Sequence, residues 1–281
     1  MLFSRRAPID RTPAEVGLDY EDVAFRAGDG IGLKGWFLPS GAAEPGPAVV
    51  LIHGWMWNRL GNVAGKVPID DRDVDFLPVT KELHDAGFHV LLFDLRRHGE
   101  SEAGRDLLTF GPIEARDFVA AVHHLRSRPD VDGQRIGALG ISMGGSIALH
   151  GAPDCQPIKA LLAYQPSTVP VFNANFCEDQ FGALGKPLPH GVEVLYRLWR
   201  SPPPSSQYPG NPARTLTDTV VHYAQGTGDK WGTMADVESM HAITPNTDGP
   251  VERFPSTSRY DGYRYVVERR EQIAEFFTKN L

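Results

Sequence analysis

Short, almost uninterrupted apolar runs recur along the chain, separated by longer segments of mixed character. The runs are Ala48 to Ile52, His89 to Phe93, Ile136 to Leu139, Ala160 to Tyr164 and Val220 to Ala224, with Val251 to Phe254 as a weaker sixth. A strand of a parallel sheet is covered on both faces and therefore reads as a nearly continuous apolar run. We interpret these runs as the buried strands of a mostly parallel sheet.

The segments between the runs place apolar residues at helical spacing. Ile113 to Arg126 and Tyr265 to Lys279 are the clearest cases, with apolar positions about 3.6 residues apart. Shorter helices are predicted over Ser146 to His150 and Thr233 to Ala242. Strands that alternate with helices predict an α/β fold with a doubly wound, mostly parallel sheet.

An antiparallel hairpin is predicted ahead of the parallel strands. Asp22 to Phe25 and Gly32 to Leu38 flank the pair Asp29-Gly30. Asp-Gly between two short apolar stretches favours a two-residue type I′ turn. We therefore expect an antiparallel N-terminal hairpin at one edge of the sheet.

Two segments are too long to be ordinary connections between a strand and a helix. Residues 58–75 follow the first buried strand, and residues 167–216 contain three consecutive prolines and an aromatic-rich stretch. Ligands of open α/β sheets bind at the carboxyl ends of the strands. We predict a single domain over residues 1–281 with residues 167–216 inserted as a small lid. The alternative is a structural excursion that does not contact substrate.

Charge and composition exclude several classes of partner. The 281 residues are 41% hydrophobic and carry a net charge of −7, so no general positive field attracts nucleic acid or anionic lipid. No apolar run is long enough for a membrane span, and the basic start of the chain, residues 1–6, precedes no apolar signal stretch. We expect a cytoplasmic protein. Cys155 and Cys177 provide neither a disulfide scaffold nor a metal-binding spacing.

One short motif suggests nucleophilic chemistry. The run Gly140-Ile141-Ser142-Met143-Gly144-Gly145 follows a predicted strand directly and opens a predicted helix. In such a sharp strand-to-helix turn, the central serine projects its hydroxyl at the edge of the sheet. Side chains two residues before and after the serine would collide, which explains glycine at positions 140 and 144. Ser142 is the candidate nucleophile.

At this point the chain resembles the α/β-hydrolase fold family of serine esterases and lipases, over nearly all its length from about Tyr20. Three further stretches match the family in order: His53-Gly54-Trp55, Asp94 to Ser101, and Gly226-Thr227-Gly228-Asp229. The second departs slightly, because Arg97 stands where the family usually has glycine. The resemblance implies the fold and an activity of the serine hydrolase type.

The resemblance also implies roles for individual residues. The backbone N–H groups of Trp55 and Met143 would form an oxyanion hole, and one such donor is typically worth about 3 kcal/mol. Asp229 falls where the family places the acid that orients a catalytic histidine. This mechanism carries its own nucleophile, Ser142, so no metal or organic cofactor is implied.

The catalytic histidine itself is missing from its expected place. The family's order is Ser, Asp, His, with the histidine in the loop after the last strand. Here that loop, residues 255–263, holds Arg259 or Tyr260 at the corresponding position, and the last histidine of the chain is His241. A guanidinium stays protonated and cannot act as a general base. Arg259 and Tyr260 are instead candidate ligand contacts, Arg259 through a carboxylate or phosphate.

The other histidines are predicted to lie on helices, strands or supporting loops rather than beside Ser142. They are His53, His84, His89, His98, His123, His124, His150, His222 and His241. His190, within the predicted lid, is the free candidate, because a lid can fold over the nucleophile. The base is therefore unassigned, with His190 retained as a possible ligand contact.

Three hypotheses about function follow from these residues. The first is a serine hydrolase of a carboxylic ester or thioester with a small or medium hydrophobic acyl group, impaired by Arg259. The second is a ligand-binding protein that keeps the fold and pocket but has lost the histidine. The third is a lyase or acyltransferase that uses the same pocket. The expected partner is a small ester or hydrophobic ligand, and aromatic residues are candidates to line its pocket: Trp55, Trp57, Tyr196, Trp199 and Trp231.

Overall fold

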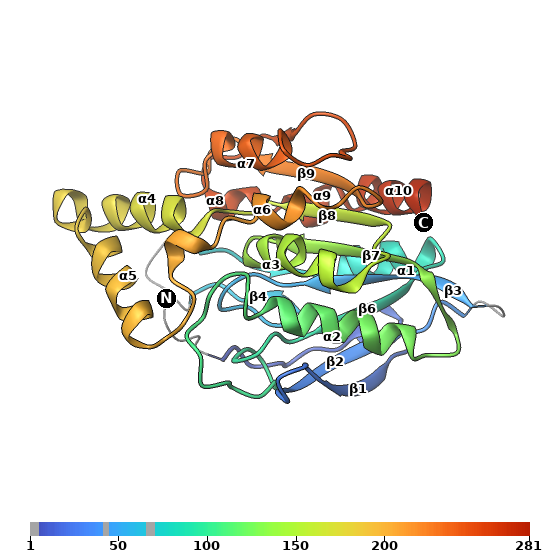
Figure 1. Ribbon diagram of the computed structural model, residues 1–281. Helices are drawn as coiled ribbons and strands as arrows, with labels where there is room; N and C mark the ends of the chain where they lie inside the picture. Colours follow the sequence, from blue (N-terminus) through green and yellow to red (C-terminus); the bar gives the residue numbers. More distant parts are fainter. Residues whose placement is uncertain (1–5, 42–44, 66–70) are drawn as a thin grey trace.

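The computed structural model describes residues 6–41, 45–65 and 71–281, arranged around one eight-stranded sheet (Figure 1). The strand order is β1-β2-β6-β3-β7-β8-β9-β10. The strands are β1 (Glu21–Arg26), β2 (Gly32–Leu38), β3 (Gly46–Ile52), β6 (His89–Phe93), β7 (Val131–Ile141), β8 (Ala160–Tyr164), β9 (Val220–Gly226) and β10 (Glu252–Phe254). From β6 to β10 all neighbouring strands are parallel, as the apolar runs predict.

The N-terminal hairpin is confirmed, but its predicted turn type is wrong. Strands β1 and β2 pair antiparallel, and β2 pairs antiparallel with β6. A type I′ turn needs positive φ at both central residues, which here are Gly28 and Asp29. Instead the Gly30 N–H donates to the Ala27 carbonyl (2.8 Å) and only Gly30 has a positive φ, 87°. Glycine is therefore required at the last position of the turn, not at its two central positions.

Helices cover both faces of the sheet (Figure 1). They are α1 (Leu77–Asp85), α2 (Ala115–Arg126), α3 (Met143–Gly151), α7 (Met234–His241), α8 (Arg259–Gly262), α9 (Tyr265–Glu268) and α10 (Arg270–Asn280), with 3-10 turns η1 (Pro13–Val16) and η2 (Ala152–Cys155). The predicted C-terminal helix is divided in two, because Arg269 leaves helical geometry with φ −108° and ψ 16°.

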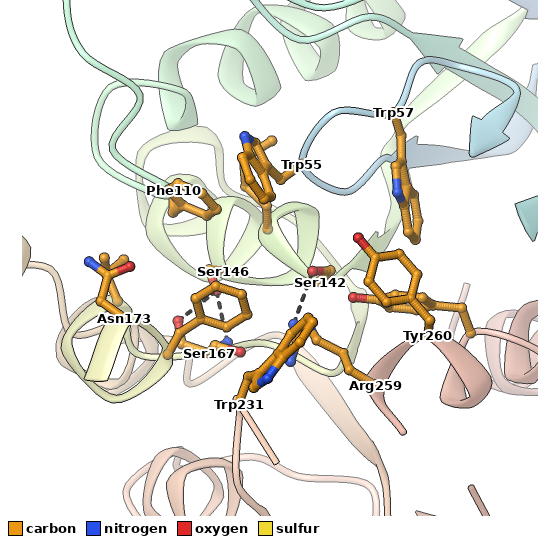
Figure 2. A pocket seen from close by; sticks show the side chains of 14 residues that line it. Trp55, Trp57, Phe110, Ser142, Ser146, Ser167, Asn173, Trp231, Arg259 and Tyr260 are labelled. Carbon is orange, nitrogen blue, oxygen red and sulfur yellow. Dashed lines mark hydrogen bonds between the residues drawn. The ribbon is translucent and has the colours of Figure 1, made fainter. Parts of the chain in front are cut away.

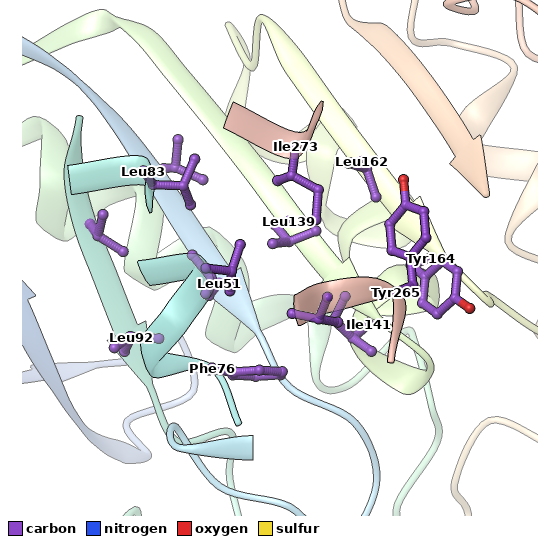
Figure 3. Packing of buried hydrophobic residues seen from close by; sticks show 14 of the residues in the cluster. Leu51, Phe76, Leu83, Leu92, Leu139, Ile141, Leu162, Tyr164, Tyr265 and Ile273 are labelled. Atoms are coloured by element: carbon purple, nitrogen blue, oxygen red, sulfur yellow. The ribbon is translucent and has the colours of Figure 1, made fainter. Parts of the chain in front are cut away.

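Two apolar layers hold the helices on the sheet. On one face, Leu83 of α1 and Ile273 of α10 pack against strand residues such as Leu139, and the rings of Tyr164 and Tyr265 stack with centroids 4.2 Å apart (Figure 3). On the other face, side chains of α2, α3 and α7 form a second cluster with the alternate positions of the same strands. Because both faces are covered, the central strands are apolar at every position.

The two long segments form structure of their own. Residues 167–216 fold into α4 (Val169–Phe181), η3 (Gly182–Gly185), α5 (Leu188–Leu198), η4 (Pro204–Ser206) and α6 (Gly210–Ala213). Figure 1 shows α4 and α5 projecting beyond the sheet. Residues 58–75 contain a short antiparallel ribbon of β4 (Gly61–Asn62) and β5 (Val74–Asp75).

Two parts of the sequence analysis concern residues that are not described. Residues 1–5, at the basic start of the chain, and residues 66–70 of the second long segment lie outside the described residues. Among the helices that are described, none has both the length and the apolar character needed to cross a bilayer.

Candidate active site

Ser142 lies at a strained turn between β7 and α3, where the motif predicts it. Its φ of 57° and ψ of −119° are disfavoured for a residue with a side chain. Its N–H donates to the Tyr164 carbonyl at 2.8 Å, which fixes the turn against β8. A Cβ at Gly140 would lie 2.5 Å from the Gly144 carbonyl oxygen, and one at Gly144 would lie 2.0 Å from that of Ile52. Both glycines are therefore needed for the turn and for its contact with β3.

The loop after β3 lies against this turn and is held by buried histidines. His98 Nε2 accepts a hydrogen bond from the Met56 N–H (3.3 Å), and His53 Nε2 accepts one from the Leu95 N–H (3.1 Å). Burial lowers the pKa of His53 to about 4 and that of His98 to about 3, so both rings are neutral and able to accept. They support the loop that carries Trp55.

Trp55 and Met143, whose N–H groups are the predicted oxyanion-hole donors, both line the pocket that contains Ser142. Trp55 follows β3 and Met143 is the first residue of α3, directly after Ser142. Within the described residues, no hydrogen bond engages the N–H of either one. An unpaired N–H at a helix N-terminus favours negative charge. The predicted oxyanion-hole donors are thus free for a ligand.

Asp229 lies in the loop after β9 and is held by several donors. Its Oδ1 accepts from the N–H groups of Trp231 (2.9 Å) and Gly232 (3.1 Å), and its Oδ2 accepts from Gln225 Nε2 (3.1 Å). The residue is 8% exposed. These bonds fix the carboxylate at the carboxyl edge of the sheet, in the place that the sequence predicts.

Arg259, the first residue of α8, joins Asp229 to Ser142. Its Nη1 is ion-paired with Asp229. Its Nη2 donates to Ser142 Oγ at 2.9 Å (Figure 2) and to the Gln165 carbonyl at 2.8 Å. Burial lowers the pKa of this guanidinium, but the carboxylate of Asp229 more than offsets that and the pKa stays above its usual range. Arg259 thus lies between Asp229 and Ser142, in the loop where the resemblance leads us to expect a histidine, and its guanidinium cannot accept a proton.

Tyr263 completes the surroundings of the serine. Its ring lines the pocket with Ser142, and the ring centroid lies 5.9 Å from the guanidinium carbon of Arg259. Burial raises the pKa of the Tyr263 phenol, so it is protonated near neutral pH. Sequence reasoning did not single out Tyr263.

None of the histidines substitutes for the missing base. His84 bonds to the Pro39 carbonyl, His222 to Glu252 and His241 to the Gly249 carbonyl. His190 is exposed on α5 and is not among the residues that line the pocket at Ser142. The structure therefore does not bring His190, predicted as a ligand contact, to the nucleophile.

Ser142 opens into a pocket with a largely aromatic wall (Figure 2). The aromatic lining residues are Trp55, Trp57, Phe110, Phe172, Trp231, Tyr260 and Tyr263. Of the predicted aromatic set, Tyr196 lies outside this pocket and Trp199 is 54% exposed. Two buried polar atoms of the wall, Trp55 Nε1 and Ser167 Oγ, have no hydrogen-bond partner among the described residues. The pocket suits an apolar ligand with a small polar group.

Gln165 and Gln225 are site residues that the sequence analysis missed. Gln165 directly follows β8, its carbonyl accepts from Arg259, and its Nε2 donates back to the Arg259 carbonyl at 3.1 Å. Gln225 lies near the end of β9 and holds Asp229. Both residues could have been identified from the sequence, because they lie at the carboxyl ends of adjacent parallel strands, where ligands of open α/β sheets bind. Across residues 6–41, 45–65 and 71–281, no group of three or more His, Cys, Asp or Glu side chains is arranged to hold a metal ion.

Comparisons with known sequences extend over most of this fold. The family model described as "Alpha/beta hydrolase family" matches residues 49–274. The uncharacterized protein YfhR of Salmonella typhi is 32% identical over 150 residues, which are 51% of this chain and 43% of that protein. The thiohydrolase aneE of Aspergillus aculeatus is 31% identical over 161 residues, 57% of this chain and 44% of its own length. The chain thus spans less than half the length of these curated relatives.

Solved structures show the same fold over the full chain. The esterase Pf2001 of Pyrococcus furiosus superposes with a TM-score of 0.73 at 22% identity and covers 100% of this chain and 98% of its own. The α/β hydrolase GrgF of Penicillium superposes with a TM-score of 0.65 at 17% identity, covering 94% and 99%. At these identities the likeness concerns the fold alone.

Proposed function

The chain belongs to the alpha/beta hydrolase family, and on that premise we propose that it is a serine hydrolase of carboxylic esters or thioesters with Ser142 as the nucleophile. The observation that carries this proposal is the strained backbone of Ser142 in the aromatic pocket that Trp55 and Met143 also line, with Arg259 linking its Oγ to Asp229. The proteins that resemble this chain include an esterase and a thiohydrolase, which supports hydrolysis.

The reaction would proceed through an acyl-enzyme. Ser142 Oγ attacks the carbonyl carbon, and the N–H groups of Trp55 and Met143 stabilise the negative charge on the carbonyl oxygen. The alcohol or thiol leaves, and water then releases the acid and regenerates the serine. Residues 167–216 act in this proposal as the lid of a single domain, because Val169 and Asn173 line the pocket.

Arg259 limits the rate of this reaction. It donates a hydrogen bond to Ser142 Oγ and cannot remove the serine proton or return it to the leaving group. The proton must pass to solvent, so turnover is slow. Leaving groups that depart as anions without being protonated are favoured, which places thioesters and aryl esters ahead of alkyl esters.

The direct test is hydrolysis of p-nitrophenyl acetate and butyrate by the parent protein, Ser142→Ala and Arg259→His. We expect slow turnover by the parent and none by Ser142→Ala. Arg259→His places an imidazole between Asp229 and Ser142 and should raise kcat by about 10²- to 10⁴-fold, the usual contribution of a general base. Activity that is unchanged in Ser142→Ala would reject Ser142 as the nucleophile.

A ligand-binding protein is the second candidate, and the bond from Arg259 Nη2 to Ser142 Oγ favours it. That bond occupies a lone pair of the nucleophile and leaves an intact aromatic pocket. If the parent and Arg259→His are both folded and equally inert, with far-UV circular dichroism as the control for folding, binding replaces hydrolysis as the function.

A further inference from the structure

A second hollow lies between α4 and α5 and adjoins the pocket at Ser142. Phe176 and Cys177 of α4 and Leu188, Val192, Leu195 and Tyr196 of α5 line it. Three residues line both hollows: Phe110, Val169 and Asn173. Because the two hollows have these lining residues in common, they are adjacent, and the second extends the apolar lining from the nucleophile into the 167–216 insertion. We call the part between the helices the α4–α5 groove.

The α4–α5 groove offers an apolar surface. Its lining contains no Asp, Glu, Lys, Arg or His among the described residues. Tyr196 turns its hydroxyl away to the Leu108 carbonyl and so presents its ring, and Cys177 is a small buried thiol. Asn173, the amide of the lining, lies at the junction with the Ser142 pocket. A hydrocarbon fits this surface, whereas a charged or strongly polar group would lose its hydration without a partner.

We propose that the α4–α5 groove binds a straight alkyl chain on the acyl side of the substrate, with the ester or thioester carbonyl at Ser142. The inference rests on the proposed function. The shared lining residues identify the occupant, because Phe110 and Val169 lie beside both the pocket that holds the carbonyl and the groove, so an acyl chain attached to that carbonyl passes them to enter the groove. Each methylene that enters should raise the specificity constant by up to about fourfold.

Two neighbouring positions of α5 provide a test variant and its control. Leu195 lines the α4–α5 groove, so Leu195→Trp fills it. Val194 is 55% exposed on the same helix and does not line the groove, so Val194→Trp adds the same bulk outside it. In the parent and Val194→Trp, kcat/KM for p-nitrophenyl esters should rise from butyrate to dodecanoate. In Leu195→Trp the rise should disappear.

The side of the ester that carries the chain is resolved by two substrates. Methyl octanoate carries it on the acyl side and octyl acetate on the alcohol side. The p-nitrophenyl series places its chain on the acyl side, so Leu195→Trp should slow methyl octanoate more than octyl acetate; the reverse order would contradict the proposal. The proposal is wrong if kcat/KM depends on the chain length of the p-nitrophenyl esters in the same way in the parent, Val194→Trp and Leu195→Trp, and if all three proteins show the same ratio of kcat/KM for methyl octanoate to octyl acetate.

A binding measurement separates this proposal from the proposed function. 2-Dodecanone has a carbonyl and a long chain but cannot be hydrolysed. It should protect Cys177, in the groove, from N-ethylmaleimide in the parent but not in Leu195→Trp, while 2-butanone gives no protection. Cys155 lies outside the groove at 2% exposure and serves as the internal control. Protection of Cys177 without any ester hydrolysis would support chain binding in the groove and reject the hydrolase function. Absence of protection would reject chain binding in the groove.

Discussion

Arg259 is the side chain on which the site depends most, because it is a charge buried to 5% exposure. Removing a guanidinium from water costs several kcal/mol, and only a close anion with good hydrogen bonds offsets this. Asp229 supplies the anion, and Ser142 Oγ and the Gln165 carbonyl accept hydrogen bonds from Nη2 of Arg259. A ligand carboxylate would therefore compete with Asp229 for Arg259 rather than find an unpaired cation.

The pairing predicts a large effect of Arg259→Met on stability. This variant leaves the Asp229 carboxylate buried without a cation, so the free energy of unfolding should fall by about 3–5 kcal/mol. Adding Asp229→Asn should recover much of the loss. Urea unfolding measures both, with Arg197→Met as the control, because Arg197 is paired with Glu193 on the exposed surface of α5 and should contribute less than about 1 kcal/mol. Equal losses in Arg259→Met and Arg197→Met would contradict the buried bridge.

Sequence reasoning located these residues but not their bonds. Ser142 and Asp229 could be placed because each follows a recognisable strand, and Arg259 because of its distance along the chain from Asp229. The bridge from Arg259 to both could not be predicted, since it depends on how α8 sits over the ends of β8 and β9. Gln165 escaped notice for the same reason: its carbonyl becomes an acceptor only once β8 and α8 are adjacent.

Among the elements, the turn between β7 and α3 is the most tightly constrained. Gly144 packs against the end of β3, where an added Cβ would lie 2.0 Å from a backbone oxygen that cannot rotate away. Gly144→Ala should therefore lower the free energy of unfolding by at least about 1–3 kcal/mol, the usual cost of overpacking. Thermal unfolding followed by circular dichroism measures the loss.

Gly191 provides the matched control for that substitution. It lies within α5, and a Cβ there has no atom within 4 Å. Gly191→Ala should be neutral or stabilising by about 0.5–1 kcal/mol, because alanine loses less backbone freedom in a helix. If Gly144→Ala were as stable as Gly191→Ala, close packing of the turn against β3 would be refuted.

Across the fold, the sheet was more predictable than its connections. The six apolar runs became six parallel strands because burial on both faces leaves a direct trace in the sequence. Turn geometry and helix ends leave a weaker trace, as the hairpin turn at Gly30 and the break at Arg269 show. The path of residues 167–216 depends on packing between α4 and α5, which the spacing of apolar residues in the sequence does not predict.

Buried titratable groups act on the stability of the entire fold with opposite signs. Burial lowers the pKa of His53, His98 and His150, so the unfolded chain binds their protons first and acidification destabilises the protein. Burial raises the pKa of Glu114 and of Asp117, so the folded state takes up their protons first, with the opposite effect. The pH dependence of the free energy of unfolding is the sum of both contributions. The difference in that free energy between the parent and a variant that lacks one group isolates the contribution of that group.

His150 is the best group to isolate, because burial lowers its pKa to about 4 and its Nε2 has no hydrogen-bond partner in the described part of the chain. An unfolded histidine titrates near 6.5, so below that pH the parent loses up to about 1.4 kcal/mol per pH unit relative to His150→Gln, until about pH 4. Urea unfolding at pH 7.5, 6 and 5 measures this divergence. A constant difference between His150→Gln and the parent would show that His150 titrates alike in the folded and unfolded chain.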